Sequence, residues 1–163
     1  PAAIRYPRGA GPGTEILENF DSLEIGKAKV INKTPSDLVI FSFGNMLDLS
    51  REIADQINCS LVDMRFIKPL DEELIEKCAK TYKHIISIEE NVITGGAGSA
   101  VNEFLAEIGY SEKLKIFGIP DEFPIVGTQE DQRDAAGLTK DKIIESLASE
   151  LNLKDLEKKV SAQ

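Results

Sequence analysis

From Lys27 onward, apolar runs of strand length alternate with segments of helical periodicity, and this alternation constrains the fold more than any other feature. The run LVIFSF at 38–43 is almost continuously apolar, which is typical of a central strand covered on both faces. Further strands are predicted at 60–67, 84–90 and 114–119, and the segment 27–32 alternates as an edge strand does. Because single helical segments separate the inner strands, the sequence predicts an α/β domain with a mostly parallel, five-stranded sheet in three layers.

Several predicted helices have recognisable starts. Asn45 and Asp71 are candidate N-caps, and the last helix is expected to start at Thr139, with Leu138 and Ile143 in the positions of a hydrophobic staple. The apolar stripes are Met46, Leu49, Ile53 and Ile57 in the first helix, Leu74, Ile75, Cys78 and Ala79 in the second, and Ile143, Ile144, Leu147 and Leu151 in the last. A short loop joins the first two strands, so the first is expected to run antiparallel at an edge. The order of the strands does not follow from the sequence.

The charge of the chain limits its partners. A formal net charge of −9 opposes binding to nucleic acid or to an anionic membrane surface. The longest apolar run is far shorter than the roughly 20 residues that span a bilayer. We therefore expect a cytoplasmic protein with neither a nucleic-acid nor a membrane partner.

Metal and nucleophile chemistry have little support in the sequence. Cys59 and Cys78 are isolated, and we expect two free thiols in or near the core. The single histidine, His84, immediately precedes an apolar run, which favours a position at the start of a strand over a catalytic base. Without paired Cys and His spacings, a zinc site is not expected.

A glycine-rich segment, Gly95–Ser99, follows a predicted strand and opens a predicted helix. This is the position at which α/β folds bind phosphates. The segment matches neither the dinucleotide fingerprint nor a Walker loop, and the preceding Glu89 and Glu90 would repel an anion. Turn geometry and close helix packing are the alternative explanation of the glycines, which we favour.

Charged side chains at three further places are candidate site residues. Glu89 and Glu90 are adjacent on a strand and would point to opposite faces, so a shared proton is not expected. Arg65 and Lys68 flank a strand end, where a solvated rim or an interface ion pair is favoured over a substrate clamp. Arg5 and Arg8 precede a glycine-rich loop, where they could hold a phosphate or form a surface ion pair; the residues alone leave both open.

The order of motifs resembles a known family. AIRYPRG, EIGKAKV, SFGNMLDLS, LVDMRFIKPLD, ISIEENVITGGAGSAVNEFL and GIPDEFPIVGTQEDQRDAAGLT follow one another from Pro1 to about Leu151. Together they resemble the C-terminal portion of the 1-deoxy-D-xylulose-5-phosphate synthases, within the transketolase-like, thiamine-diphosphate-dependent enzymes. The resemblance implies a parent enzyme that condenses pyruvate with glyceraldehyde 3-phosphate, with decarboxylation, for isoprenoid, thiamine and pyridoxal synthesis.

The resemblance also implies how the chain divides. Residues 1–26 would be the last strand of a pyrimidine-binding domain and a linker, 27–151 a transketolase C-terminal-like domain, and 152–163 a charged tail. Pro1 would then be a break inside the parent chain. By the family pattern, Arg8 would hold the phosphate of glyceraldehyde 3-phosphate, whereas no role carries over to Arg5.

The resemblance implies that this segment is not catalytic alone. The family's Gly-Asp-Gly motif for magnesium and diphosphate is absent from these residues, and the catalytic glutamate and histidines of the family lie upstream. We therefore expect the parent to use thiamine diphosphate and Mg, and this segment to bind neither. Its expected role is to pack against the upstream domains and to extend a homodimer. A 2-oxoacid dehydrogenase β-subunit and an independent small-ligand regulatory domain are the alternatives.

Overall fold

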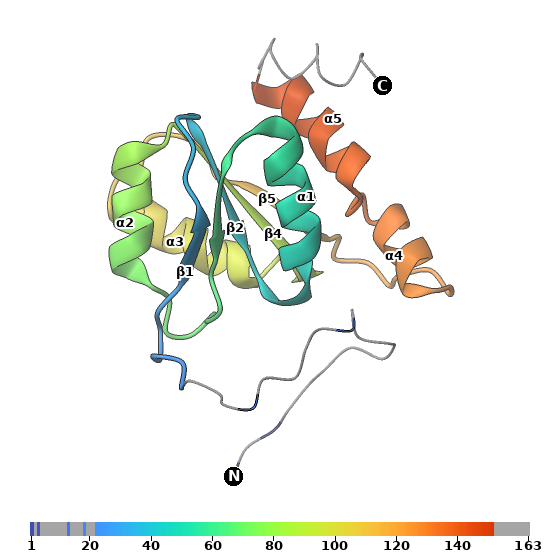
Figure 1. Ribbon diagram of the computed structural model, residues 1–163. Coiled ribbons are helices and arrows are strands. Elements are labelled where there is room, and N and C mark those ends of the chain that lie inside the picture. Colours follow the sequence, from blue (N-terminus) through green and yellow to red (C-terminus); the bar gives the residue numbers. More distant parts are fainter. Residues whose placement is uncertain (2, 4–12, 14–17, 19–21, 152–163) are drawn as a thin grey trace.

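The computed structural model of the chain describes residues 22–151, together with Pro1, Ala3, Gly13 and Glu18 (Figure 1). Within that part, five strands form a single sheet in the order β1-β3-β2-β4-β5. The strands are β1 (Lys29–Asn32), β2 (Leu38–Ser42), β3 (Ser60–Asp63), β4 (His84–Val92) and β5 (Lys115–Ile119). The pairs β3–β2, β2–β4 and β4–β5 are parallel, and β1 pairs antiparallel with β3 at the edge. The predicted fold class and the antiparallel edge strand are confirmed.

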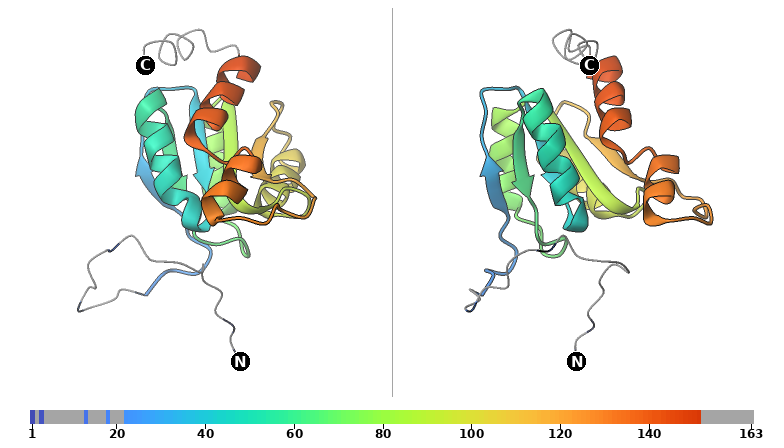
Figure 2. Two further views of the ribbon diagram at one scale, coloured as in Figure 1. Left: turned by 90° about the vertical axis from the view of Figure 1, so that its right-hand side faces the viewer. Right: turned by 45° about the vertical axis from the view of Figure 1, so that its right-hand side comes forward.

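Helices cover both faces of the sheet, which gives three layers (Figure 2). One face packs against α1 (Leu47–Ile57) and α5 (Lys140–Leu151), and the other against α2 (Glu72–Thr81) and α3 (Ala97–Glu107). The remaining elements are the 3₁₀ turn η1 (Gly44–Met46) and the short helix α4 (Gln129–Ala135). Each face therefore has its own hydrophobic core.

Strand β2 shows why its sequence lacks the usual alternation of apolar and polar residues. Leu38 and Ile40 belong to the core on the α1 side, whereas Val39 and Phe41 belong to the core on the α2 side. All four side chains are at most 3% exposed. A strand buried on both faces needs apolar residues at every position, as the sequence indicates.

Two of the predicted helix starts agree with the structure. The Asp71 carboxylate accepts a hydrogen bond from the backbone N–H of Leu74 at 3.2 Å, so it is the N-cap of α2. The last helix is α5, and the backbone N–H of Ile143 donates to the carbonyl oxygen of Thr139 at 3.0 Å. Leu138 and Ile143 are both buried, as a hydrophobic staple requires.

Asn45 is not the N-cap of the first helix, and that prediction is wrong. The turn η1 comes first, α1 begins at Leu47, and its N-cap residue Met46 makes no side-chain capping bond. The Asn45 side chain instead donates to the carboxylate of Glu90. The Asn45 side chain, which the local sequence pattern assigned to helix capping, is therefore bonded to a residue 45 positions away in the chain.

The predicted strand at 60–67 is also too long. Strand β3 ends at Asp63, and Arg65 has a φ of +56°, which an extended strand does not allow. The apolar residues that follow still face inward in part, since Met64 is fully buried. The apolar pattern correctly indicated that Met64 is buried, but the strand ends before this residue.

Candidate functional site

The carboxyl edge of the sheet, where β2 to β5 end, is the place where an α/β fold of this kind binds ligands. The chain leaves β2 through α1 toward β3 on one side, and leaves β4 through α3 toward β5 on the other. The strand order therefore reverses between β2 and β4, and a crevice at such a point is the usual ligand position. The residues that follow these two strands decide what the crevice can hold.

The side chain of Glu89, a residue of β4, lies at the N-terminus of α3. Its two carboxylate oxygens accept hydrogen bonds from the backbone N–H groups of Ala97, at 2.8 Å, and Gly98, at 2.7 Å. The residue is only 2% exposed. A helix N-terminus attracts anions because its first N–H groups lack partners. Here the protein's own carboxylate is that anion.

The glycines of this region make room for Glu89. A Cβ on Gly96 would lie 2.5 Å from one carboxylate oxygen of Glu89, and one on Gly98 would lie 2.6 Å from Ser87 Oγ. On the neighbouring strand, a Cβ on Gly118 would lie 3.3 Å from Glu89 Cγ. These close approaches support close packing as the explanation of the glycine-rich segment, and they leave no space for a phosphate at these N–H groups.

Glu90 points to the other face of β4 and closes the crevice. One of its oxygens accepts from Nδ2 of Asn45 at 2.6 Å, and the other accepts from Nε of Arg133, on α4, also at 2.6 Å. The two glutamates therefore have separate partners and do not form a catalytic pair. The crevice between β2 and β4 is spanned by the protein's own hydrogen bonds.

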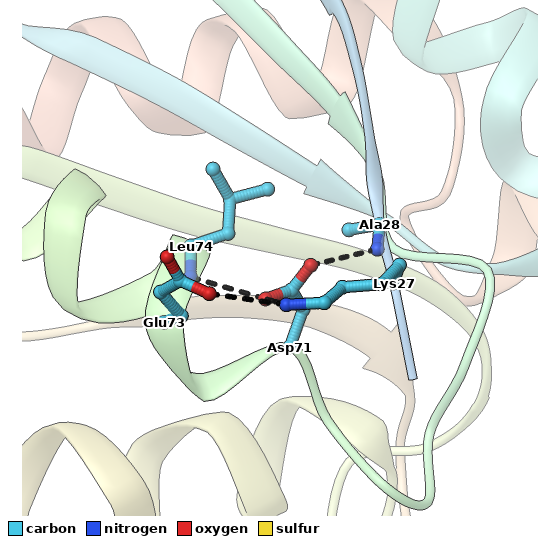
Figure 3. A network of polar contacts seen from close by, with 5 residues as sticks. All are labelled: Lys27, Ala28, Asp71, Glu73 and Leu74. Atoms are coloured by element: carbon cyan, nitrogen blue, oxygen red, sulfur yellow. Dashed lines mark hydrogen bonds and ion pairs between the residues drawn. The ribbon is translucent and has the colours of Figure 1, made fainter. Parts of the chain in front are cut away.

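A second polar cluster holds the segment that leads into β1 (Figure 3). Besides capping α2, the buried carboxylate of Asp71 accepts from the backbone N–H of Ala28 at 2.9 Å. Lys27 donates to Glu73 at 3.1 Å and lies 3.7 Å from Asp71. The hydrogen bond to Glu73 and the charge of Asp71 raise the pKa of Lys27. This cluster fixes the entry of the chain into the domain.

The remaining candidate residues are not brought together. Arg65 lies 3.7 Å from Asp63 of the preceding strand, and Lys68 is exposed in the loop after β3. His84 begins β4, as predicted, and is half-buried. Arg5 and Arg8 lie outside the described residues.

The two cysteines are buried and free, as predicted. Burial raises the pKa of the Cys59 thiol to about 12 and that of Cys78 to about 11. Neither thiol has the low pKa of a reactive cysteine. Both therefore have a packing role.

One pocket is bordered by α4, a helix that the periodicity of the sequence does not indicate. It has a volume of about 330 Å³ and lies between α4 and the loop that follows β5. Its walls include Glu90, Ile119, Phe123, Ile125, Arg133 and Leu138. The helix has no apolar stripe. At its start, however, the sequence has the capping-box pattern Thr128-x-x-Asp131, and both hydrogen bonds of the box are formed in the structure. That box is the signal that could have revealed α4.

Neither a metal cluster nor a membrane span was found in the part of the chain that the structure describes. No three His, Cys, Asp or Glu side chains there are grouped so that they could hold a metal ion. No described helix is both long enough and apolar enough to cross a bilayer.

The family follows from a comparison with family models. Residues 26–143 match the model described as "Transketolase, C-terminal domain". The chain belongs to the transketolase C-terminal domain family. This match includes all five strands and the carboxyl edge described above.

Curated relatives of this transketolase C-terminal domain are 1-deoxy-D-xylulose-5-phosphate synthases. The synthase of Psychromonas ingrahamii is 47% identical over 145 residues, which are 86% of this chain and 23% of the relative. That of Pseudoalteromonas translucida is 43% identical over 152 residues, or 93% of this chain and 24% of the relative. The chain thus spans about a quarter of the length of these relatives.

Solved structures agree with the fold of the transketolase C-terminal domain. A structure described as "Split gene transketolase, inactive beta4 tetramer" superposes with a TM-score of 0.72 and 28% identity, over 81% of this chain and 44% of that one. A transketolase from Pichia stipitis has a TM-score of 0.50 and 14% identity, over 80% of this chain and 18% of that chain. The second likeness supports the fold alone.

Proposed function

We propose that this chain is the C-terminal domain of a 1-deoxy-D-xylulose-5-phosphate synthase. The parent condenses pyruvate with glyceraldehyde 3-phosphate, with loss of carbon dioxide, and its product serves isoprenoid, thiamine and pyridoxal synthesis. The observation that carries this proposal is the 47% identity to the Psychromonas ingrahamii synthase over 86% of the chain. The unbroken order of motifs from AIRYPRG to AAGLT supports it.

The cofactors of the parent would be held outside this domain. Thiamine diphosphate and Mg require a site for a diphosphate and oxygen ligands for the metal. At the carboxyl edge, the N–H groups of α3 are bonded to Glu89, and the Glu90 carboxylate is bonded to Asn45 and Arg133. These residues do not fit the cofactor, so we assign its binding to the upstream domains and derive no chemical step here.

The role of the domain itself would be structural. It would pack against the upstream domains of its own chain and extend a homodimer. A solved neighbour that includes a domain of this fold is described as an inactive β4 tetramer, which supports a part in assembly. Two buried, free cysteines are typical of a reducing compartment, which supports a cytoplasmic parent.

Arg8 is the residue of this chain that we assign to substrate binding. In the proposed parent, its guanidinium would hold the phosphate of glyceraldehyde 3-phosphate through charged hydrogen bonds. The assignment is supported by the motif RYPRG at 5–9. Arg5, in the same motif, receives no role.

A chimera tests the proposed function. The Psychromonas ingrahamii synthase would have its matched C-terminal segment replaced by this chain, and product formation would be followed with both substrates. We expect an active chimera, with the truncated synthase that lacks the segment as the inactive control. A chimera that folds and binds thiamine diphosphate but forms no product would contradict the proposal.

Calorimetric titration tests where the cofactor binds. The 163-residue chain alone and the chimera would each be titrated with thiamine diphosphate and MgCl₂. We expect binding heat from the chimera and none from the chain alone. Saturable binding to the chain alone would overturn the assignment of the cofactor to the upstream domains.

A further inference from the structure

The exposed large apolar side chains are concentrated at one end of the molecule. Among the described residues, seven such side chains are exposed, and six of them lie at the carboxyl edge. These six, here called the edge side chains, are Leu23, Ile25, Ile67, Phe123, Ile125 and Val126. The seventh, Ile108, follows the C-terminal end of α3 at the opposite end of the sheet.

The topology explains why residues so far apart in sequence share this edge. Ile67 lies in the loop after β3, and Phe123 to Val126 lie in the loop after β5, so both loops follow carboxyl ends of parallel strands. Leu23 and Ile25 precede β1, which runs antiparallel to β3. The start of β1 therefore lies at the same edge as the end of β3, and Figure 1 shows the chain entering the domain there.

The loop after β5 is held in place by hydrogen bonds. Nε2 of Gln132 donates to the backbone oxygen of Ile125 at 3.0 Å, and Thr128 and Asp131 form the capping box of α4. Arg133 ties the same helix to Glu90 on β4. Phe123 and Val126 are nonetheless fully exposed. An apolar loop fixed in one conformation loses little entropy when a partner covers it.

At the β1 end of the carboxyl edge, the segment before β1 is also held by a hydrogen bond and by close packing. The N–H of Ala28 is bonded to Asp71, and a Cβ on Gly26 would lie 2.9 Å from Cγ of Pro69 (Figure 3 shows the Asp71 cluster). Leu23 and Ile25 are thus displayed beside the loop that carries Ile67.

The charges along this edge are acidic at the β5 end and mixed at the β1 end. Near β5, Asp121, Glu122 and Glu130 are exposed. At the other end Lys68 is exposed, Arg65 is paired with Asp63, and Glu24 is exposed next to Leu23. A surface that packs against the edge would be apolar opposite the edge side chains and basic opposite the loop after β5. The 330 Å³ pocket behind Phe123 would accept one large apolar side chain of that surface.

We infer that the carboxyl edge is the surface on which the preceding domain of the parent chain packs. The inference rests on the proposed function. It adds which face of the domain is covered, which residues make the contact, and what chemical character the opposing surface has. The curated relatives are about four times as long as this chain, and the segment that carries Leu23 and Ile25 enters the domain at the same edge. A domain that precedes this segment in the same chain would be held near the edge side chains at high effective concentration.

Cysteine labelling in the chimera tests this surface. Val126→Cys and Ile108→Cys would each be placed in the chimera and in the chain alone, and the rate of reaction with a maleimide would be measured by mass spectrometry. We expect labelling at position 126 to be at least tenfold slower in the chimera than in the chain alone. Labelling at position 108, the matched control, should be the same in both within about twofold. The buried Cys59 and Cys78 should contribute little in either protein.

Three results would overturn the inference. Equal labelling of position 126 in the chimera and the chain alone would show that the edge stays uncovered. Protection in the chain alone that grows with its concentration would identify a second copy as the occupant. Equal slowing at positions 126 and 108 in the chimera would show that no particular face is covered.

The labelling result is independent of turnover, so the two proposals fail separately. An inactive chimera that protects position 126 would count against the proposed function alone. An active chimera with an unprotected position 126 would count against the docking surface alone. A second variant, Phe123→Ser with Val126→Ser, should lower the affinity of the chain for the separately expressed upstream part of the relative by tenfold or more, whereas Ile108→Ser should not.

Discussion

At the scale of single residues, Glu89 and Glu90 show how neighbours on a strand acquire different roles. The first is enclosed and bonded to two backbone N–H groups, and the second is half-buried between a side chain of η1 and one of α4. The alternation of a strand sends them to opposite faces. The carboxylates thus join strand to helix on each face of the sheet.

Removing the Glu89 carboxylate should destabilise the domain strongly. Glu89→Ala would leave the N–H groups of Ala97 and Gly98 without partners in a buried place, so we expect a loss of about 2–4 kcal/mol in the free energy of unfolding. Urea unfolding measures it. Glu103→Gln, on the exposed face of α3, is the control and should change stability by less than about 0.5 kcal/mol. Equal effects of the two variants would contradict the role assigned to Glu89.

Because of Cys59, the free energy of unfolding should decrease as the pH rises above about 9. The unfolded chain loses this thiol proton near the ordinary pKa of 9.0, whereas burial keeps the folded pKa at about 12. Between these values the folded state binds more protons, so stability that is complete below pH 9 falls as the pH rises. Urea unfolding of the wild type and Cys59→Ala between about pH 8 and 11 measures the difference in slope. Parallel slopes would mean that Cys59 does not contribute.

At the scale of elements, α4 depends on contacts distant in sequence more than on its own residues. The helix has no buried residue, yet it is joined to β4 through Arg133 and begins at a complete capping box. A short helix of this kind is marginal by itself. The bond between Arg133 and Glu90 joins this helix, and with it the apolar loop before it, to the sheet.

The coupling between Glu90 and Arg133 should be measurable. Their side chains are 22% and 29% exposed, so solvent screens the pair less than it screens a surface pair. A double-mutant cycle with alanine at both positions should give a coupling of about 1–2 kcal/mol. The exposed pair Asp134 and Lys142 is the control, with an expected coupling below about 0.5 kcal/mol. Indistinguishable couplings would show that α4 is not fixed to β4 by this pair.

At the scale of the whole molecule, the carboxyl edge is where the described part of the chain exposes most of its large apolar side chains. Both faces of the sheet are covered by helices, and the crevice at the carboxyl edge is spanned by Asn45, Glu90 and Arg133. Six of the seven exposed large apolar side chains among the described residues lie along that edge. This arrangement is the basis of the docking surface proposed above.

Arg8 should affect one substrate of the parent and spare the other. In the active chimera, Arg8→Ala should raise KM for glyceraldehyde 3-phosphate by roughly ten- to 150-fold, because charged hydrogen bonds contribute about 1.5–3 kcal/mol. KM for pyruvate should stay within about twofold, since pyruvate carries no phosphate. Steady-state kinetics measure both, and Arg5→Ala is the matched control. Unchanged kinetics with the aldehyde would remove Arg8 from the site.

The sequence by itself determined that the chain has five strands and the helices α1, α2, α3 and α5, that β1 is an antiparallel edge strand, and that Asp71 caps a helix. These features depend on periodicity and on bonds that reach only a few residues along the chain. The same local reasoning failed for Asn45, for the end of β3 and for α4. For Asn45 the deciding partner was Glu90, 45 residues away, whereas α4 has no apolar stripe and its local signal is the capping box.

Only the tertiary structure decided the order of the strands and, with it, the character of the carboxyl edge. Leu23, Ile67 and Phe123 come to lie along one edge of the sheet because long-range backbone pairing places β1 antiparallel beside β3 and β5 parallel beside β4. An apolar pattern records that a residue is buried or lies on one face, but it carries no information on which strand pairs with which. The tertiary structure also decided that the glycine-rich segment does not leave its N–H groups free for a phosphate. The carboxylate of Glu89 accepts hydrogen bonds from the N–H groups of Ala97 and Gly98 at the start of α3.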